Sequence, residues 1–250
     1  MNESPSATLE SRIATLLVYE DASAALEALR LSEGLPKPGT ESGDATAQLL
    51  FDIGFRLERF EQNVDAVTTY HRVLPYPVVD VRITAGAWFR IGLLRDRSGN
   101  WIQAGVGYRR ALELAPSWIY MASLAQYHLA ELVAAEENYG EAATLYQKLE
   151  NGPPHPEIRP ERILLELGRC LLRSGDCRAA RSKLNSLLRV FAMSPLVVQA
   201  HRLLAEIDEQ DGDSNAAVRH YQCIVENSNA EPALKVAAAH RAAALYRSKR

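Results

Sequence analysis

Apolar and small residues recur along the chain at helical spacing and give way, at regular intervals, to short polar stretches. Trp88, Ile91 and Gly92 fall on one face of a helix, and Ala104 and Tyr108 on one face of the next. The break between them reads RSGN, and the equivalent breaks downstream read RSGD and QDGD. Glycine and polar residues of this kind end one helix and begin another. The pattern predicts helix, tight turn, helix.

This two-helix pattern repeats with a fixed period. A small residue of the second helix recurs at Ala66, Ala104, Ala142, Ala180 and Ala217, separated by 38, 38, 38 and 37 residues. Two further series run in step with it, at Gly54, Gly92, Ala130, Gly168 and Ala205, and at Tyr70, Tyr108, Tyr146, Leu184 and Tyr221. Prolines follow the second helices, at Pro77, Pro116, Pro153, Pro154, Pro195 and Pro232. Periods of this length are typical of stacked helical arrays.

The period divides the chain into three parts. Residues 1–44 contain a degenerate N-terminal helical hairpin and a connection rich in proline and glycine. Residues 45–232 hold five repeats, approximately 47–84, 85–122, 123–160, 161–197 and 198–232. Residues 233–250 are predicted to form a capping helix and a basic tail, because the last apolar face of a stack has to be shielded from water.

The unit around residues 85–118 resembles the tetratricopeptide repeat. It carries the family's aromatic, glycine, alanine and proline positions at Trp88, Ile91, Gly92, Gly99, Trp101, Ala104, Tyr108, Ala111 and Pro116. The resemblance implies an all-α fold, a right-handed α-solenoid of stacked helix–turn–helix repeats. Three residues depart from the pattern, Arg95, Leu184 and Asp208, and the period is 38 where 34 is usual in the family.

Two glycines lie inside a predicted second helix, where each costs about 1 kcal/mol relative to alanine. These are Gly105 and Gly107. Either another segment packs unusually close to them, or this unit is easily deformed. Both interpretations remain open from the sequence.

Charge and composition argue against two classes of partner. The chain has 28 basic and 31 acidic residues, a net charge of −3, and so lacks the positive excess of a nucleic-acid binder. No segment approaches the 18 or so apolar residues of a membrane span, and the first 30 residues lack the basic and apolar regions of a signal sequence. We therefore expect a cytoplasmic protein without nucleic-acid or membrane partners.

Motifs for catalysis and for cofactor or metal binding are missing from the sequence. It contains no glycine-rich phosphate loop, nucleophile elbow or HExxH motif. Cys170, Cys177 and Cys223 are too scattered for a zinc site, although Cys170 and Cys177 could form a redox pair if their Cα atoms lie close enough. We therefore expect that the protein is not an enzyme and has no catalytic residue, metal or cofactor.

Candidate binding residues lie on the first helices, which line the concave face of stacked hairpins. Phe51, Phe55, Phe89, Leu93 and Tyr127 would form an aromatic and apolar stripe there, and a stripe exposed to solvent is a typical binding surface. Polar candidates near it are Arg90, Arg97 and His128, with Arg169 and Arg173 farther along, in a half made more basic by Arg162 and Arg202. Alternatively, the N-terminal hairpin covers the stripe and makes it core. Both interpretations stand.

The functional hypothesis is a scaffold that holds a segment of another protein in this groove. Chaperone C-termini are not the expected ligand, because the clamp positions of the repeats that bind them hold Phe51, Phe55 and Arg90 here. A helical-repeat RNA binder is one alternative, disfavoured by the charge balance. A small-ligand sensor or enzyme using His128 and Glu131 is another. Self-association through an end repeat also remains possible.

Overall fold

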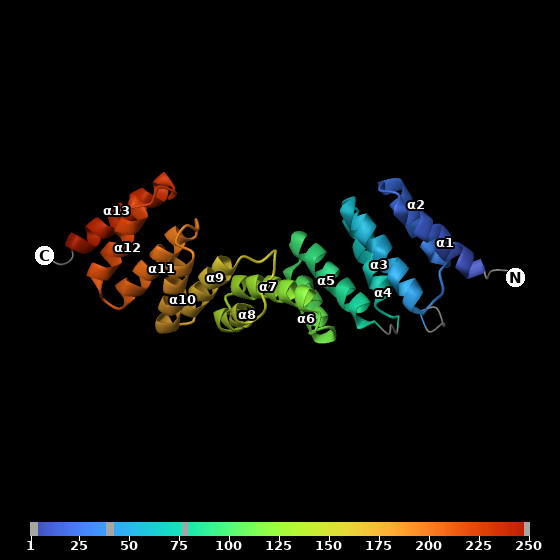
Figure 1. The fold of residues 1–250 in the computed structure, drawn as a ribbon, viewed down its shortest axis with the longest axis horizontal. Coiled ribbons are helices and arrows are strands. Elements are labelled where there is room, and N and C mark those ends of the chain that lie inside the picture. Colours follow the sequence, from blue (N-terminus) through green and yellow to red (C-terminus); the bar gives the residue numbers. More distant parts are fainter. Residues whose placement is uncertain (1–4, 39–42, 77–79, 248–250) are drawn as a thin grey trace. The chain divides into compact units, whose positions relative to one another are not determined.

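The computed structural model describes residues 5–38, 43–76 and 80–247, and the regular secondary structure of this part of the chain is all helical (Figure 1). Its α-helices are α1 (Pro5–Val18), α2 (Ala22–Leu31), α3 (Gly43–Arg59), α4 (Asn63–Val73), α5 (Val81–Arg97), α6 (Trp101–Leu114), α7 (Ile119–Ala135), α8 (Tyr139–Asn151), α9 (Pro160–Arg173), α10 (Cys177–Val190), α11 (Val197–Gln210), α12 (Ser214–Glu226) and α13 (Pro232–Arg247). A 3-10 turn, η1 (Ser32–Gly34), follows α2. Pro77, part of the proline- and glycine-rich connection, and the end of the basic tail lie outside the described residues.

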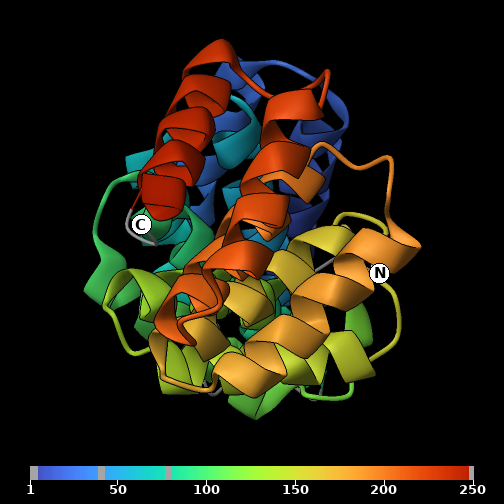
Figure 2. The same cartoon turned by 90° about the vertical axis from the view of Figure 1, so that its left-hand side faces the viewer.

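The chain forms two units, residues 1–125 and 126–250, which divide within α7. In the first unit the hairpins α1–α2, α3–α4 and α5–α6 stack in chain order around a core that contains Ile13, Leu50 and Leu57. In the second unit α9–α10 and α11–α12 stack in the same way, with Leu184 and Leu204 in their core. Figure 2 shows the helices of the second unit from its C-terminal end.

The small residues of the repeat allow the two helices of a hairpin to lie close together. Ala66 and Ala104, on second helices, are completely buried. On the first helix, a Cβ atom added to Gly54 would lie 2.8 Å from the ring of Tyr70, and one on Gly92 equally close to the ring of Tyr108. The glycine therefore makes room for the tyrosine ring of the same hairpin, as dense core packing requires.

The N-terminal hairpin follows the same register as the five repeats. Ala28, on α2, lies 38 residues before Ala66 and is likewise completely buried. Helix α1 packs on α3, and its residue Ile13 is part of the core of the first unit. The hairpin α1–α2 therefore belongs to the stack of the first unit, in addition to the repeats that the sequence pattern marks clearly.

The last helix, α13, packs on α12 at the end of the second unit. Its buried side chains are Ala238 and Ala242, and Ala238 joins Val198 and Ile224 in a small apolar cluster. Within the described residues, no helix is long and apolar enough to cross a membrane.

Candidate functional site

In the first unit, the predicted aromatic residues differ in how much surface they offer. Phe89 on α5 is 7% exposed, with its ring 6.0 Å from that of Tyr108. Phe51 on α3 is half-buried against the ring of Tyr70 and lies beside Gly86 of α5. These two rings therefore contribute mainly to packing, each against the tyrosine of the second helix of its own hairpin.

Phe55 is 36% exposed and is the most accessible of these rings. The guanidinium of Arg90 lies 4.8 Å from its centroid, a cation–π contact between α3 and α5. Phe55 also lines a pocket of about 300 Å³ together with Leu17 of α1 and Leu49 of α3. The N-terminal hairpin thus lies beside Phe55 and leaves the ring accessible. Leu93, one turn after Arg90 on α5, is half-buried.

The two predicted arginines of the first unit share one carboxylate. Arg90 and Arg97 each place a guanidinium nitrogen 3.4 Å from Glu58 of α3, and Tyr70 donates a hydrogen bond of 3.2 Å to the same side chain. The Glu58 side chain is only 7% exposed. Burying a carboxylate is costly unless it is paired and hydrogen-bonded, so both guanidinium groups serve the structure of the stack.

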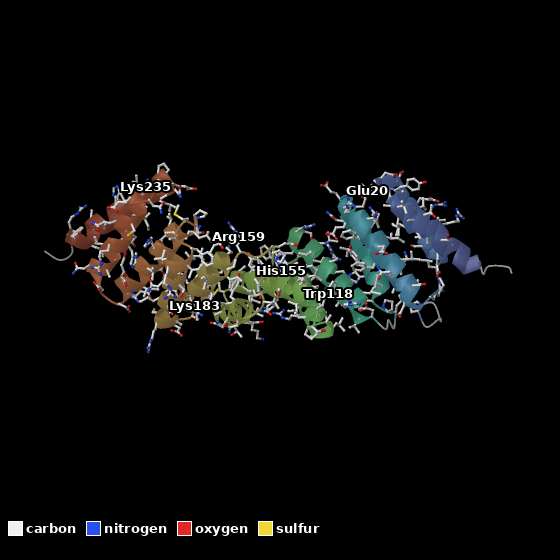
Figure 3. The ribbon with its side chains drawn as sticks, in the orientation of Figure 1. Glu20, Trp118, His155, Arg159, Lys183 and Lys235 are labelled. Carbon is white, nitrogen blue, oxygen red and sulfur yellow. The ribbon has the colours of Figure 1, made fainter. Side chains whose placement is uncertain are left out.

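A similar ion pair joins the N-terminal hairpin to the next one. Glu20, which is labelled in Figure 3, lies in the turn after α1. Its carboxylate is 3.5 Å from Arg56 and 3.2 Å from Arg59 of α3. Glu20 precedes Glu58 by 38 residues, so the two carboxylates occupy equivalent positions in successive hairpins. Arginines of the following first helix contact each of them.

In the second unit, Tyr127 and His128 lie side by side on α7. The Tyr127 ring lies 6.2 Å from that of Tyr146 and 5.7 Å from the imidazole of His128, whose Nδ1 atom is 3.6 Å from Glu131. Burial, together with the nearby negative charge of Glu131, raises the pKa of Tyr127 to about 12. Tyr127 therefore stays a neutral phenol and can donate or accept hydrogen bonds near neutral pH.

The predicted arginines of the second unit are also engaged by carboxylates. Arg169 forms an ion pair with Glu166, which is almost completely buried on the same helix, α9. Arg173 reaches Glu206 of α11 at 2.7 Å. The sequence indicates that this half of the groove is basic, but carboxylates balance the charges of these two arginines.

One recurrent interaction was missed by the sequence analysis. The tyrosine of the second helix donates to a carboxylate twelve residues earlier, on the first helix of the same hairpin. The pairs are Tyr70 with Glu58 at 3.2 Å, Tyr108 with Asp96 at 3.2 Å, and Tyr221 with Glu209 at 2.7 Å. Their signal was visible as an acidic residue in constant register with the tyrosine series.

The departure from the repeat pattern at Asp208 marks a buried polar cluster. Asp208 on α11 is almost completely buried and forms an ion pair with Arg181 of α10, whose guanidinium also reaches Asp211 at 2.7 Å. His220 of α12 places Nε2 3.5 Å from Asp208, and its Nδ1 atom is 2.9 Å from Nδ1 of His201. The cluster links three helices through charged and polar groups where an apolar side chain is usual.

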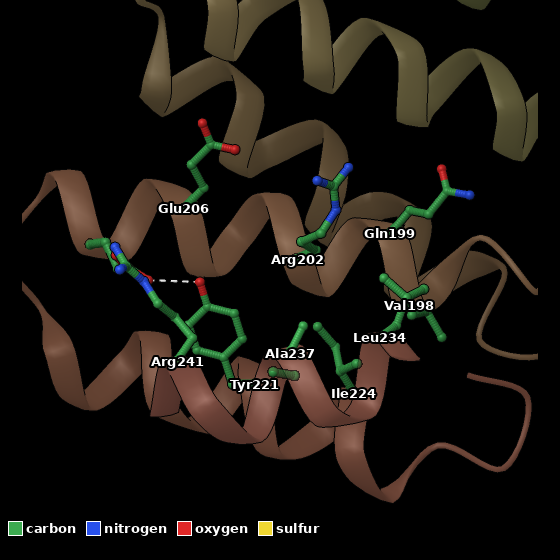
Figure 4. A pocket seen from close by; sticks show the side chains of 11 residues that line it. Val198, Gln199, Arg202, Glu206, Tyr221, Ile224, Leu234, Ala237 and Arg241 are labelled. Atoms are coloured by element: carbon green, nitrogen blue, oxygen red, sulfur yellow. Dashed lines mark hydrogen bonds and ion pairs between the residues drawn. The ribbon is translucent and has the colours of Figure 1, made fainter. Parts of the chain in front are cut away.

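A pocket of about 360 Å³ lies between the hairpin α11–α12 and the last helix, α13 (Figure 4). Its apolar wall includes Val198, Ile224, Leu234 and Ala237. Polar side chains of α11 also line it, among them Gln199, Arg202, Glu206 and Glu209. Arg202 was predicted on this face from the sequence, but the pocket was not, because the last helix was expected to act only as a cap.

The cysteines are free thiols. Cys170 is buried, and burial raises its pKa to about 11, so it remains protonated and unreactive at neutral pH. Within the described residues, no group of three or more His, Cys, Asp or Glu side chains is arranged to hold a metal ion.

Comparison with known proteins identifies the repeat. The family model described as tetratricopeptide repeat matches residues 89–156 and 165–232, together more than half of the chain. No curated protein sequence shows significant similarity to it.

Several solved structures share the fold. YrrB, a TPR protein, is 14% identical, with 89% of this chain and 100% of YrrB covered and a TM-score of 0.65. MamA from Desulfovibrio magneticus RS-1 is 15% identical, with 70% and 91% covered and a TM-score of 0.55. PilF of Pseudomonas aeruginosa is 15% identical, with 84% and 88% covered and a TM-score of 0.55. The resemblance and the fold class predicted from sequence are confirmed: the chain belongs to the tetratricopeptide repeat family.

Proposed function

We propose that this protein is an interaction scaffold that holds a segment of a partner protein against the first helices of its hairpins. The observation that carries the proposal is the accessible Phe55 ring, which borders a pocket and is fixed from one side by Arg90. Aromatic side chains held rigidly in such a position are typical anchors for a partner side chain, because little conformational entropy is lost on binding.

The other predicted residues support this role to different degrees. In the first unit, Leu93 adds apolar surface, whereas Phe89 is buried against Tyr108. In the second unit, Tyr127 and His128 offer a phenol and an imidazole, both partly accessible, as hydrogen-bonding groups. One relative by fold, YrrB, is described as having an unusual peptide-binding site.

The paired arginines favour a protein ligand over RNA. Binding to a nucleic-acid backbone depends on cations that are available to phosphates. Arg90 and Arg97 share Glu58, while Arg169 and Arg173 contact Glu166 and Glu206. These four guanidinium groups already have anionic partners within the fold.

The test compares substitutions at two exposed positions, one on a first helix and one on a second helix. The purified chain, its Phe55→Glu variant and a Val64→Glu control are used to retain proteins from the native lysate, after circular dichroism has shown equal helicity. Val64 lies on the second helix α4 and is 80% exposed, so its substitution adds the same charge at a position that does not line the pocket beside Phe55. Phe89 is unsuitable for this test because it is buried.

We expect a protein retained by the wild-type chain and by Val64→Glu to be lost with Phe55→Glu. Equal retention by all three versions would contradict binding at Phe55. Loss with Val64→Glu alone would move the binding surface to the second helices.

A further inference from the structure

We infer that the pocket between α11, α12 and α13 takes an acidic segment of a partner protein, with a bulky apolar side chain in the pocket and a neighbouring carboxylate on Arg202. This inference rests on the proposed function, since it assumes a protein segment as ligand. It adds a second binding position and specifies the chemistry of what binds there.

The shape and lining of the pocket favour an apolar side chain. A volume of about 360 Å³ lies in the lower part of the range found for ligand sites. Val198 and Ile224 are buried at its base, whereas Leu234 and Ala237 of α13 remain exposed along its edge. Covering these apolar groups would remove them from water, which is favourable by roughly 25 cal/mol per Å² of apolar surface.

Most of the charged groups around the pocket are already neutralised. Glu209 contacts Arg241 of α13 and accepts a hydrogen bond of 2.7 Å from Tyr221, as the dashed line in Figure 4 marks. Glu206 is held by Arg173 at 2.7 Å. The two glutamates therefore already have partners within the fold.

Arg202 differs from the other arginines of this face. It is exposed, lines the pocket and forms no hydrogen bond or ion pair with any residue in the described part of the chain. Figure 4 shows it on α11 between Gln199 and Glu206, with Ile224, Leu234 and Ala237 below them. Gln199, equally without such a partner among the described residues, can donate to the same ligand.

A free guanidinium beside an apolar pocket selects its ligand by charge. A carboxylate can accept two parallel N–H donors from one guanidinium, which gives strength and orientation together. A lysine or arginine at this point of the ligand would instead meet Arg202 and be repelled. The ligand that satisfies both features is a segment in which Asp or Glu lies within one helical turn of Leu, Ile, Met or Phe.

The experiment starts from a random library of twelve-residue peptides displayed on phage and selected on the full chain. We expect the selected peptides to combine an acidic residue with a bulky apolar residue within four positions. A selected peptide is then synthesised with an amidated C-terminus, so that its carboxylates are those of side chains, and its affinity is measured by fluorescence anisotropy.

Two variants and one control locate the binding site. Arg202→Ala removes the cation and should weaken binding about tenfold. Ala237→Phe fills the pocket from an exposed position and should abolish binding. Arg219→Ala removes an exposed arginine of α12 that does not line the pocket, and should leave the affinity unchanged.

A double-mutant cycle tests the carboxylate contact directly. Replacing the peptide's Glu by Gln should weaken binding to the wild-type chain but have little further effect on Arg202→Ala. Additive losses would overturn the assignment of Arg202. So would a selected peptide that binds with a free C-terminal carboxylate and no longer binds once it is amidated.

The inference and the proposed function fail in different ways. Peptides whose binding is unaffected by Ala237→Phe but lost with Phe55→Glu overturn the inference and leave the scaffold function standing. Selected peptides without acidic enrichment also overturn it. A library that yields no peptide for any version, together with no partner retained from lysate, contradicts both.

Discussion

Gly107 of α6 lies directly against Gly92 of α5. A Cβ atom on Gly107 would stand 2.8 Å from the Cα and N atoms of Gly92 and 2.8 Å from the carbonyl oxygen of Trp88. All three are backbone atoms, which cannot move without displacing a helix. Close approach of two helices therefore explains this glycine, one of the two possibilities that the sequence left open.

Substitution of the two glycines of α6 should have opposite effects. We expect Gly107→Ala to lower the free energy of unfolding by about 1–3 kcal/mol, because the added methyl group overpacks the contact with α5. Gly105→Ala should raise it by up to about 1 kcal/mol, since alanine favours the helix and its nearest neighbour is the flexible end of Arg109, at 3.3 Å. Urea unfolding followed by circular dichroism measures both. Equal destabilisation by the two variants would contradict this prediction and show that α6 tolerates no side chain at either position.

The turn inside the hairpins requires a left-handed residue at a constant position, which is not always glycine. Gly99, Gly175 and Gly212 have φ angles of 77°, 92° and 76°, and Glu61 and Glu137 occupy the equivalent positions at 61° and 63°. A side chain in this conformation costs roughly 1–2 kcal/mol. The two glutamates are thus points of local strain.

Replacing one strained residue should stabilise the protein. We expect Glu137→Gly to raise the free energy of unfolding by roughly 0.5–1 kcal/mol. Glycine relieves the backbone strain, but part of this gain is lost because glycine is more flexible in the unfolded chain. Glu136→Gly is the matched control, because its φ is not positive and only the entropic cost remains. Thermal unfolding compares the two. A lower melting temperature for Glu137→Gly would mean that its side chain contributes more than the strain costs.

Helix α4 lacks a cap that other second helices have. Asn100 and Asn138 accept hydrogen bonds from the N–H groups three residues later, whereas Gln62 makes no such bond at the start of α4. We expect Gln62→Asn to stabilise the protein by about 1 kcal/mol, because the shorter amide can reach the free N–H groups. Asn100→Gln is the reciprocal change and should destabilise by a similar amount. Urea midpoints that move in the same direction for both variants would contradict this explanation.

The paired histidines of the second unit should make stability depend on pH. Burial lowers the pKa of His201 to about 4 and also lowers that of His220, against an attraction to Asp208 that raises it. The close approach of their Nδ1 atoms requires one nitrogen to donate and the other to accept, so protonation of both rings breaks the contact. Arg181, held by Asp208 and Asp211, adds positive charge beside His220.

The sign of the effect follows from the lowered pKa values. The unfolded chain binds protons near pH 6.5 and the folded chain only at lower pH, so stability is fully present above about pH 6.5 and decreases as the pH falls toward about 4. Urea midpoints between pH 7.5 and 4.5 measure this dependence. A His201→Gln/His220→Gln variant should show a weaker dependence over the same range. An unchanged slope in that variant would assign the effect to carboxylates elsewhere.

Much of the fold was predictable from residues that act within one hairpin. The small residue at Ala104, the turn glycine at Gly99 and the cap at Asn100 recur at constant spacing because each hairpin solves the same local problem. Helix periodicity and turn chemistry depend on neighbours within a few residues, and so they are visible in a single sequence. The additional N-terminal hairpin was harder to see, because Ala28 is the main trace of the repeat there.

The tertiary structure alone decided which charges and rings remain available. Arg90 and Arg97 were predicted as groove cations, but their common partner Glu58 belongs to the preceding hairpin, and pairing between hairpins depends on how they stack. The same reason applies to the pocket that α13 completes beside Arg202. The sequence by itself determined the repeated hairpin and its internal contacts, whereas contacts across hairpins required the positions of side chains in three dimensions.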